Sequence, residues 1–259
     1  MPSAADISSR IIEAVMAQKL APGTRLGEQQ LAMLFDCSRT IVREALTRLA
    51  TRGIVTVSAR RGWFVVEPSR DEAREAFEAR RVIEVGLIRE MPAMGKPAIR
   101  QLKLHLQREK AAIRGNDVGA RSFLLGDFHV CLAECLGNHL LADTLRDFTA
   151  RTTLIAMLYQ SSHDAVQSCE DHVQIVAALE AGDGDRAARL MAAHIGSVKD
   201  ALRLQPAAAE EDPLSGLRDA LAPLATSTSS LKSPKAASAK KADEAPLSDP
   251  PATYLGALL

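Results

Sequence analysis

Aromatic residues are scarce in this chain of 259 residues, and long apolar runs are missing. Phe, Trp and Tyr together make up 3% of the sequence, whereas Ala and Leu are abundant. This composition favours helices, because strands are enriched in aromatic and β-branched residues. No run of 18 apolar residues occurs, so we expect no helix that spans a membrane.

The chain also has no excess charge of either sign and few cysteines. The 32 Lys and Arg residues balance 32 Asp and Glu, and the hydrophobic content of 47% excludes a wholly disordered chain. The first ten residues lack the basic and then apolar pattern of a signal peptide. We therefore expect a cytoplasmic protein, in which the four cysteines remain buried, reduced thiols and form no disulfide framework. They are Cys37, Cys131, Cys135 and Cys169.

The zero net charge conceals a basic N-terminal segment. Residues 1–70 carry ten Lys and Arg against six Asp and Glu, whereas residues 71–205 and 206–259 each have a small acidic excess. A basic segment in a neutral chain is weak evidence for a polyanionic partner such as nucleic acid.

The first 70 residues predict three helices followed by a β-hairpin. Ala21-Pro22-Gly23 is a turn signal after the first helix, Ser38 is a good N-cap for the third, and Gly53 ends it. Two β-prone runs follow, at 54–57 and 63–66, and the tip between them is basic.

The third helix has one apolar face and one polar, basic face. Its apolar residues recur at helical spacing from Val42 to Leu49. A helix-turn-helix protein exposes its recognition helix in this way, and the fork of Arg matches the acceptor pair of guanine. The alternative is a solvated helix face beside a structural hairpin. We expect DNA contacts from Arg39, Thr40, Arg43 and Thr47, and from Arg60, Arg61 and Gly62 at the hairpin tip.

Every apolar pattern from residue 71 to residue 205 is helical. Short connections between such helices indicate an antiparallel bundle. After Gln205 the composition shifts to Pro, Ala, Ser, Thr and Lys, which predicts a disordered tail with at most a short helix at 214–224. The expected bundle helices are 71–91, 98–115, 118–136, 139–161, 164–181 and 184–204.

The sequence therefore predicts a mainly α fold in three parts. A winged helix-turn-helix domain occupies residues 1–70, an all-helical domain residues 71–205, and a low-complexity tail residues 206–259.

Several motifs in the basic segment resemble the winged helix of GntR-type bacterial transcription regulators. They occur in order and at the right spacing across about residues 7–67. The helical part is similar to the FadR branch, whose effector domain is an all-α bundle of the FCD type. The N-terminal motifs are Ala21-Pro-Gly-Thr-Arg-Leu26, Gln30-Leu-Ala32, Cys37-Ser-Arg-Thr-Ile-Val-Arg-Glu-Ala-Leu46 and Gly53-Ile-Val55; the bundle motifs are Glu78-Ala-Arg-Arg-Val-Ile-Glu84, Phe128-His129, Leu136-Gly-Asn138 and the stretch from His172 to His194.

This resemblance implies a homodimer that binds operator DNA and responds to a small metabolite, usually a carboxylate, bound in the helical domain. By position, Arg39, Thr40 and Arg43 match the base-contacting residues of the family, and Gly62 matches the glycine of the wing. Gln29 departs from the pattern, because some members carry Arg at the start of the second helix.

Three histidines lie on the apolar faces of three different expected helices. They are His129, His172 and His194. Buried imidazoles need partners, and one divalent transition metal such as zinc would satisfy all three; the spacing from His172 to His194 also resembles the family's metal-binding pattern.

The resemblance is incomplete at this site. Metal-binding members usually place Asp one turn before the first His, and here that position is Leu125. Three protein ligands would then remain, with water or the effector completing the shell. The alternative is a metal-free pocket in which the histidines hydrogen-bond the ligand.

Arginine is a natural clamp for the carboxylate of an effector, because two parallel N–H donors fix its orientation. Arg80 matches an Arg of the family in the first bundle helix, and Arg151 is a second candidate. Each could instead form an intramolecular ion pair, and for Arg151 we favour that alternative. His105, His139 and His163 lie near expected helix ends or on polar faces, and we assign them no role.

We therefore predict a ligand-responsive, sequence-specific DNA-binding transcription regulator that is not an enzyme. One alternative is a metal-dependent hydrolase using the three-histidine site, although no HExxH motif occurs. The other is an effector-binding or scaffolding protein whose winged helix no longer binds DNA, and the intact Arg39 and Arg43 argue against it.

Overall fold

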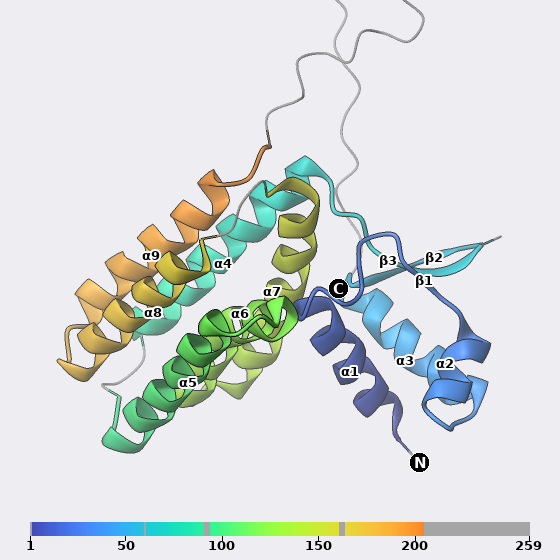
Figure 1. The fold of residues 1–259 in the computed structure, drawn as a ribbon, viewed down its shortest axis with the longest axis horizontal. Helices are drawn as coiled ribbons and strands as arrows, with labels where there is room; N and C mark the ends of the chain where they lie inside the picture. Colours follow the sequence, from blue (N-terminus) through green and yellow to red (C-terminus); the bar gives the residue numbers. More distant parts are fainter. Residues whose placement is uncertain (1, 60, 91–93, 161–163, 205–259) are drawn as a thin grey trace, which may run out of the picture. The chain divides into compact units, whose positions relative to one another are not determined.

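The computed structural model describes residues 2–59, 61–90, 94–160 and 164–204. Within these ranges the chain is mainly helical and has one small sheet, as predicted (Figure 1). None of the helices in them has the length and apolarity needed to cross a membrane. The predicted tail from residue 206, with its short helix at 214–224, lies outside the described residues, as do Arg60 and His163.

The N-terminal part is a winged helix-turn-helix. Its three antiparallel strands are arranged in the order β1-β3-β2, so that β2 and β3 form the predicted hairpin. The two-residue strand β1 was not predicted, because it is too short to show an alternating pattern and forms by pairing with β3. The elements are α1 (Ala4–Met16), β1 (Arg25–Leu26), α2 (Glu28–Leu34), α3 (Arg39–Thr51), β2 (Val55–Ser58) and β3 (Gly62–Val65).

Helix α3 begins and ends where its sequence predicts. The Ser38 side chain accepts a hydrogen bond from the backbone N–H of Ile41, and Gly53 follows the helix with a φ of +68°. The apolar stripe of α3 is fully buried and packs in one core with α1. Each buried Leu or Val contributes roughly 1.5–3 kcal/mol, so burial fixes which face of α3 remains exposed.

The remaining helices form the predicted bundle, with ends within a few residues of expectation. Helices α6, α7, α8 and α9 each begin at an Asp or Asn whose side chain accepts a hydrogen bond from a backbone N–H of the first turn. Helix α4 packs on α9, α5 on α6 and α8, and α6 on α7. The six helices are α4 (Arg70–Glu90), α5 (Lys96–Arg114), α6 (Val118–Cys135), α7 (His139–Tyr159), α8 (Ala165–Glu180) and α9 (Gly184–Asp200).

The interior of the bundle is not purely apolar. Large side chains such as Phe77, Phe128 and Met191 fill most of it. A set of polar side chains is equally buried beside them, and these need partners because water cannot reach them. They are Arg80, Glu84, His105, Glu109, His129, Thr149, Thr152, Ser168, His172 and His194.

Candidate functional site

Three histidines from three helices meet inside the bundle. His129 of α6, His172 of α8 and His194 of α9 are only 4%, 1% and 5% exposed. One ring nitrogen of each lies within 4.8 Å of those of the other two. The Nε2 atoms of His172 and His194 are 3.2 Å apart. The structure thus brings together the residues that the three apolar stripes singled out.

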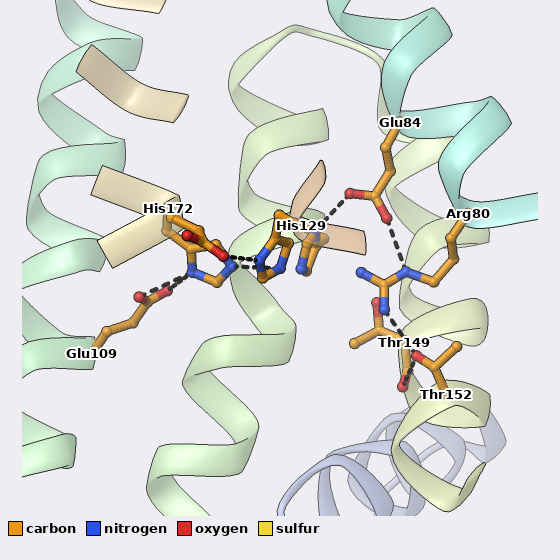
Figure 2. A network of polar contacts seen from close by, with 9 residues as sticks. Arg80, Glu84, Glu109, His129, Thr149, Thr152 and His172 are labelled. Carbon is orange, nitrogen blue, oxygen red and sulfur yellow. Dashed lines mark hydrogen bonds and ion pairs between the residues drawn. The ribbon is translucent and has the colours of Figure 1, made fainter. Parts of the chain in front are cut away.

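A carboxylate stands behind each imidazole; Figure 2 shows Glu84 beside His129 and Glu109 beside His172. Each carboxylate faces the Nδ1 atom, so that Nδ1 carries the proton and donates, which leaves a lone pair on Nε2. Three neutral imidazoles with a free lone pair, gathered in one buried space, are what a metal ion requires of its ligands. The distances are 2.5 Å for His129–Glu84, 3.1 Å for His172–Glu109 and 3.1 Å for His194–Asp171.

The spacing of two of these nitrogens also fits a metal. Two nitrogens bound to one zinc ion at about 2.1 Å in tetrahedral geometry lie roughly 3.4 Å apart, close to the 3.2 Å between His172 and His194. A direct hydrogen bond between the two rings would be less favourable. The donating ring, if neutral, would lose its Nδ1 proton and turn a lone pair toward its carboxylate.

The carboxylates behind the histidines were not predicted, although two of them gave a signal. Glu84 and Glu109 lie on the apolar stripes of their helices, and an acid in such a stripe is buried only when it is paired. They are 1% and 0% exposed. Asp171 gave no such signal, because its side chain is 28% exposed and does not belong to the buried stripe of α8.

The placement of His105 corrects the prediction that it lies on a polar face. It is 4% exposed, on the same stripe of α5 as Glu109. Its Nε2 donates to the carbonyl of Leu124 at 2.9 Å and lies 3.4 Å from Glu109. Burial alone would lower the pKa of His105, but hydrogen bonds to Cys131, Glu109 and Leu124 raise it to about 10. A charged His105 therefore offsets the charge of Glu109. His139 is exposed.

Arg80 and Glu84 form a buried ion pair beside the histidines. The guanidinium Nε donates to Glu84 at 2.9 Å, and Nη1 donates to the hydroxyl of Thr152 at 3.0 Å (Figure 2). Burial by itself raises the pKa of Glu84, but the charges of His129 and Arg80 outweigh it and lower the pKa to about 2. Glu84 is thus an anion that orients His129 on one side and Arg80 on the other.

A small cavity joins these groups. Its volume is about 90 Å³, and Arg80 and Leu125 line it together with the three histidines. Thr149 also lines it, and its buried Oγ1 has no hydrogen-bond partner among the described residues. An unpartnered buried hydroxyl beside an arginine is a ready contact for a polar ligand. Sequence analysis gave no reason to single out Thr149.

Arg151 is not among the residues that line this cavity. Its Nη2 donates to the carbonyl of Gly53 at 3.0 Å. It lines a separate cavity of about 610 Å³, between α1, α3 and α7. This contact is intramolecular, but its acceptor is a backbone carbonyl and not the carboxylate of the ion pair that was favoured for Arg151; we do not assign Arg151 to the effector.

Acid should destabilise the metal-free chain. Burial lowers the pKa of His129 to about 4 and that of His172 to about 3, against 6.5 in an exposed histidine. Between pH 6.5 and these values the unfolded chain binds more protons, so stability is complete above pH 6.5 and falls below it. His105, with its raised pKa, acts in the opposite direction. We expect a net loss on the order of 2 kcal/mol at pH 5.

Urea unfolding of chelator-treated protein at pH 7.5 and pH 5 measures this loss. His139→Gln removes an exposed histidine and should leave the difference between the two pH values unchanged. Equal stability of the wild-type chain at both pH values would contradict the burial of neutral imidazoles.

The residues expected to contact DNA lie on the exposed face of α3 and on the wing. Arg39, Thr40, Arg43 and Thr47 are all exposed. On the wing, the guanidinium of Arg61 lies 5.4 Å from the centre of the Phe64 ring. Gly62, also expected to contact DNA, begins β3 with a φ of +90° and has open space where a Cβ would be. An L side chain there would be strained, so the turn itself requires glycine. Gln29, at the start of α2, is exposed.

Comparison with known proteins assigns both parts of the fold. The family "Bacterial regulatory proteins, gntR family" matches residues 3–65, and the FCD domain matches residues 75–197. The transcriptional repressor RspR of Escherichia coli K12 is 29% identical over 189 residues, which are 71% of this chain and 82% of RspR. The regulator LutR of Bacillus subtilis is 27% identical over 211 residues, which are 71% of this chain and 94% of LutR.

A solved structure supports the fold. A GntR-type regulator from Rhodococcus sp. RHA1 superimposes with a TM-score of 0.66 and 24% identity, over 76% of this chain and 95% of that one. The two curated relatives are transcription regulators, and the hydrolase alternative finds no support among these comparisons.

Proposed function

This chain belongs to the GntR family of bacterial regulatory proteins and carries an FCD domain. We propose that a small carboxylate binds inside its helical bundle and causes the protein to leave operator DNA or to rearrange on it. It is a DNA-binding transcription regulator by family. Residues 1–70 would bind the operator and residues 71–205 would sense the ligand. A single winged helix buries little DNA surface, so we propose a homodimer on a near-palindromic operator.

The three converging imidazoles carry the sensing half of this proposal. Each has its Nδ1 atom held by a carboxylate, which supports a divalent transition metal such as zinc held by His129, His172 and His194. Such an ion would supply a Lewis acid with a free position for a carboxylate oxygen. Leu125 contributes no ligand atom, so it leaves that position open.

The other groups in the cavity suit a small carboxylate. A volume of about 90 Å³ corresponds to roughly three water molecules, so a carboxylate with a short substituent would fit. Arg80 has five N–H donors, and its bonds to Glu84 and Thr152 use two of them. The unpartnered hydroxyl of Thr149 would donate to the same ligand.

Operator recognition is tested by alanine variants of the recognition helix. Arg39→Ala and Arg43→Ala should each remove a base contact worth about 1–3 kcal/mol, which is roughly a 5- to 150-fold loss of operator affinity. Binding to random DNA should fall less, because base contacts add little there. Fluorescence anisotropy against the promoter of its own gene, and against a random duplex, measures both affinities.

Arg61→Ala is the matched control, because a phosphate contact carries no sequence information. It should weaken operator and random DNA alike and flatten the dependence of affinity on salt. If the variants of α3 also lowered both affinities equally, α3 would not be the recognition helix. A chain ending at Gln205 should still form a dimer and bind DNA.

A further inference from the structure

One carboxylate joins the two arginines of the recognition helix to the wing. Glu28 is the first residue of α2 and accepts hydrogen bonds from Arg39 and Arg43 of α3 and from the indole N–H of Trp63 on β3. Arg43 approaches it with two donors, Nε and Nη2. The distances to Glu28 oxygens are 3.1 Å from Arg39 Nη2, 2.9 Å from Arg43 Nε, 2.7 Å from Arg43 Nη2 and 3.1 Å from Trp63 Nε1.

Glu28 differs from its two partners in exposure. Its side chain is 15% exposed, whereas those of Arg39 and Arg43 are 62% and 60% exposed. The carboxylate is therefore fixed beneath a surface on which both guanidiniums remain open. Hydrogen bonds from Arg43 hold the pKa of Glu28 at about 2, so it is an anion at neutral pH.

We propose that Glu28 positions Arg39 and Arg43 for base contacts and competes with DNA phosphates for them, so that it limits binding to non-operator DNA. This inference rests on the proposed base contacts of the two arginines. Guanine offers two neutral acceptors to the donors that Glu28 leaves free, and this contact does not require the ion pair to break. A phosphate, in contrast, is attracted by the positive charge of the two arginines, and Glu28 cancels half of that charge.

The charge balance gives the size of the effect. With Glu28 the three side chains carry a net charge of +1, and with Gln at this position they would carry +2. Each additional neutralised phosphate steepens the plot of log affinity against log salt by about 0.9 and strengthens binding near 0.1 M salt by about eightfold. Glu28→Gln should therefore bind random DNA about five- to tenfold more tightly and with a steeper slope.

An acid on α3 itself, Glu44, provides the control. Glu44 pairs with Arg48 of the same helix, and its side chain is 56% exposed. Glu44→Gln removes the same charge, here from α3 itself, without touching Arg39 or Arg43. It should strengthen operator and random DNA by similar factors, whereas Glu28→Gln should lower the ratio of operator to random affinity by about tenfold, because the arginines also lose their positioning.

The experiment is a set of anisotropy titrations with the full chain, using its own promoter and a random duplex between 50 and 200 mM salt. The expected result is a lowered ratio and a steeper slope for Glu28→Gln and a wild-type ratio for Glu44→Gln. A wild-type ratio for Glu28→Gln would overturn the inference, and so would an equal change of ratio in both variants.

Two further variants keep the outcome unambiguous. Glu28→Asp retains the charge but withdraws the carboxylate by one methylene group, so the ratio should fall while the salt slope stays at the wild-type value; an unchanged ratio would also overturn the inference. Arg43→Ala distinguishes a failure of the proposed recognition helix from a failure of the role of Glu28 alone. If it left operator binding intact, the proposed recognition helix would fail; if it weakened operator binding while Glu28→Gln behaved as wild type, only the role of Glu28 would fail.

Discussion

Leu125→Asp should destabilise the metal-free chain by about 3–5 kcal/mol, and added zinc should restore the loss. Leu125 is 6% exposed, packs beside Cys169 and lines the histidine cavity one turn before His129. Without a cation, an Asp there is a buried carboxylate in an apolar contact. With zinc it becomes a fourth ligand with an oxygen donor.

Thermal melting with chelator and with zinc measures both halves of this result. For a domain of this size, such a loss of stability lowers the melting temperature by roughly 6–20 °C. Leu179→Asp is the matched control, because Leu179 is 8% exposed in the bundle core and is not among the cavity-lining residues. Zinc should not rescue this control. A Leu125→Asp chain that zinc fails to restore would count against the metal site.

Arg80→Ala should cost a similar amount, about 3–5 kcal/mol, for a different reason. Glu84 is 1% exposed, and once His129 is neutral Arg80 is its one charged partner among the described residues, so the carboxylate would be left buried without a counter-charge there. Arg80→Lys retains the charge but not the planar fork that matches a carboxylate. We therefore expect Arg80→Lys to keep most of the stability and to lose binding of small carboxylates.

Urea unfolding and calorimetry with two- to four-carbon carboxylates measure these two effects. Arg146→Ala is the control, because Arg146 pairs with Glu134 and Asp143 near the surface, where such pairs contribute about 0–1 kcal/mol. If Arg80→Ala unfolded at the same urea concentration as wild type, the ion pair would not stabilise the bundle. Unchanged carboxylate binding by Arg80→Lys would exclude Arg80 from the effector site.

Periodicity was enough to predict the helices and the faces that they bury. The stripe of α3 placed Arg39 and Arg43 on the exposed side, and the stripes of α6, α8 and α9 placed three histidines in the interior. Both results follow from the 3.6-residue repeat of the helix. A residue at helical spacing from apolar residues lies on their buried face, and a residue half a turn away lies on the exposed face. The convergence of the histidines then follows from packing such faces together.

Pairings between helices could not be predicted in this way. Asp171 contacts His194 of the next helix, Arg151 contacts the carbonyl of Gly53, and Glu28 contacts Arg43. Each contact depends on how two separate elements are placed relative to one another in the fold. A local pattern shows which face a side chain occupies, but not which side chain stands opposite.

The donor set of the histidine site is distributed over five helices, and this constrains when the site can form during folding. The α8–α9 hairpin brings two imidazoles together across 22 residues, a short loop with a low closure entropy. Glu84 lies 45 residues from His129, and Glu109 lies 63 residues from His172. The full set therefore exists only after α4, α5 and α6 have docked on that hairpin. A metal ion would accordingly lock a bundle that has already folded, and would not act as the template on which it folds.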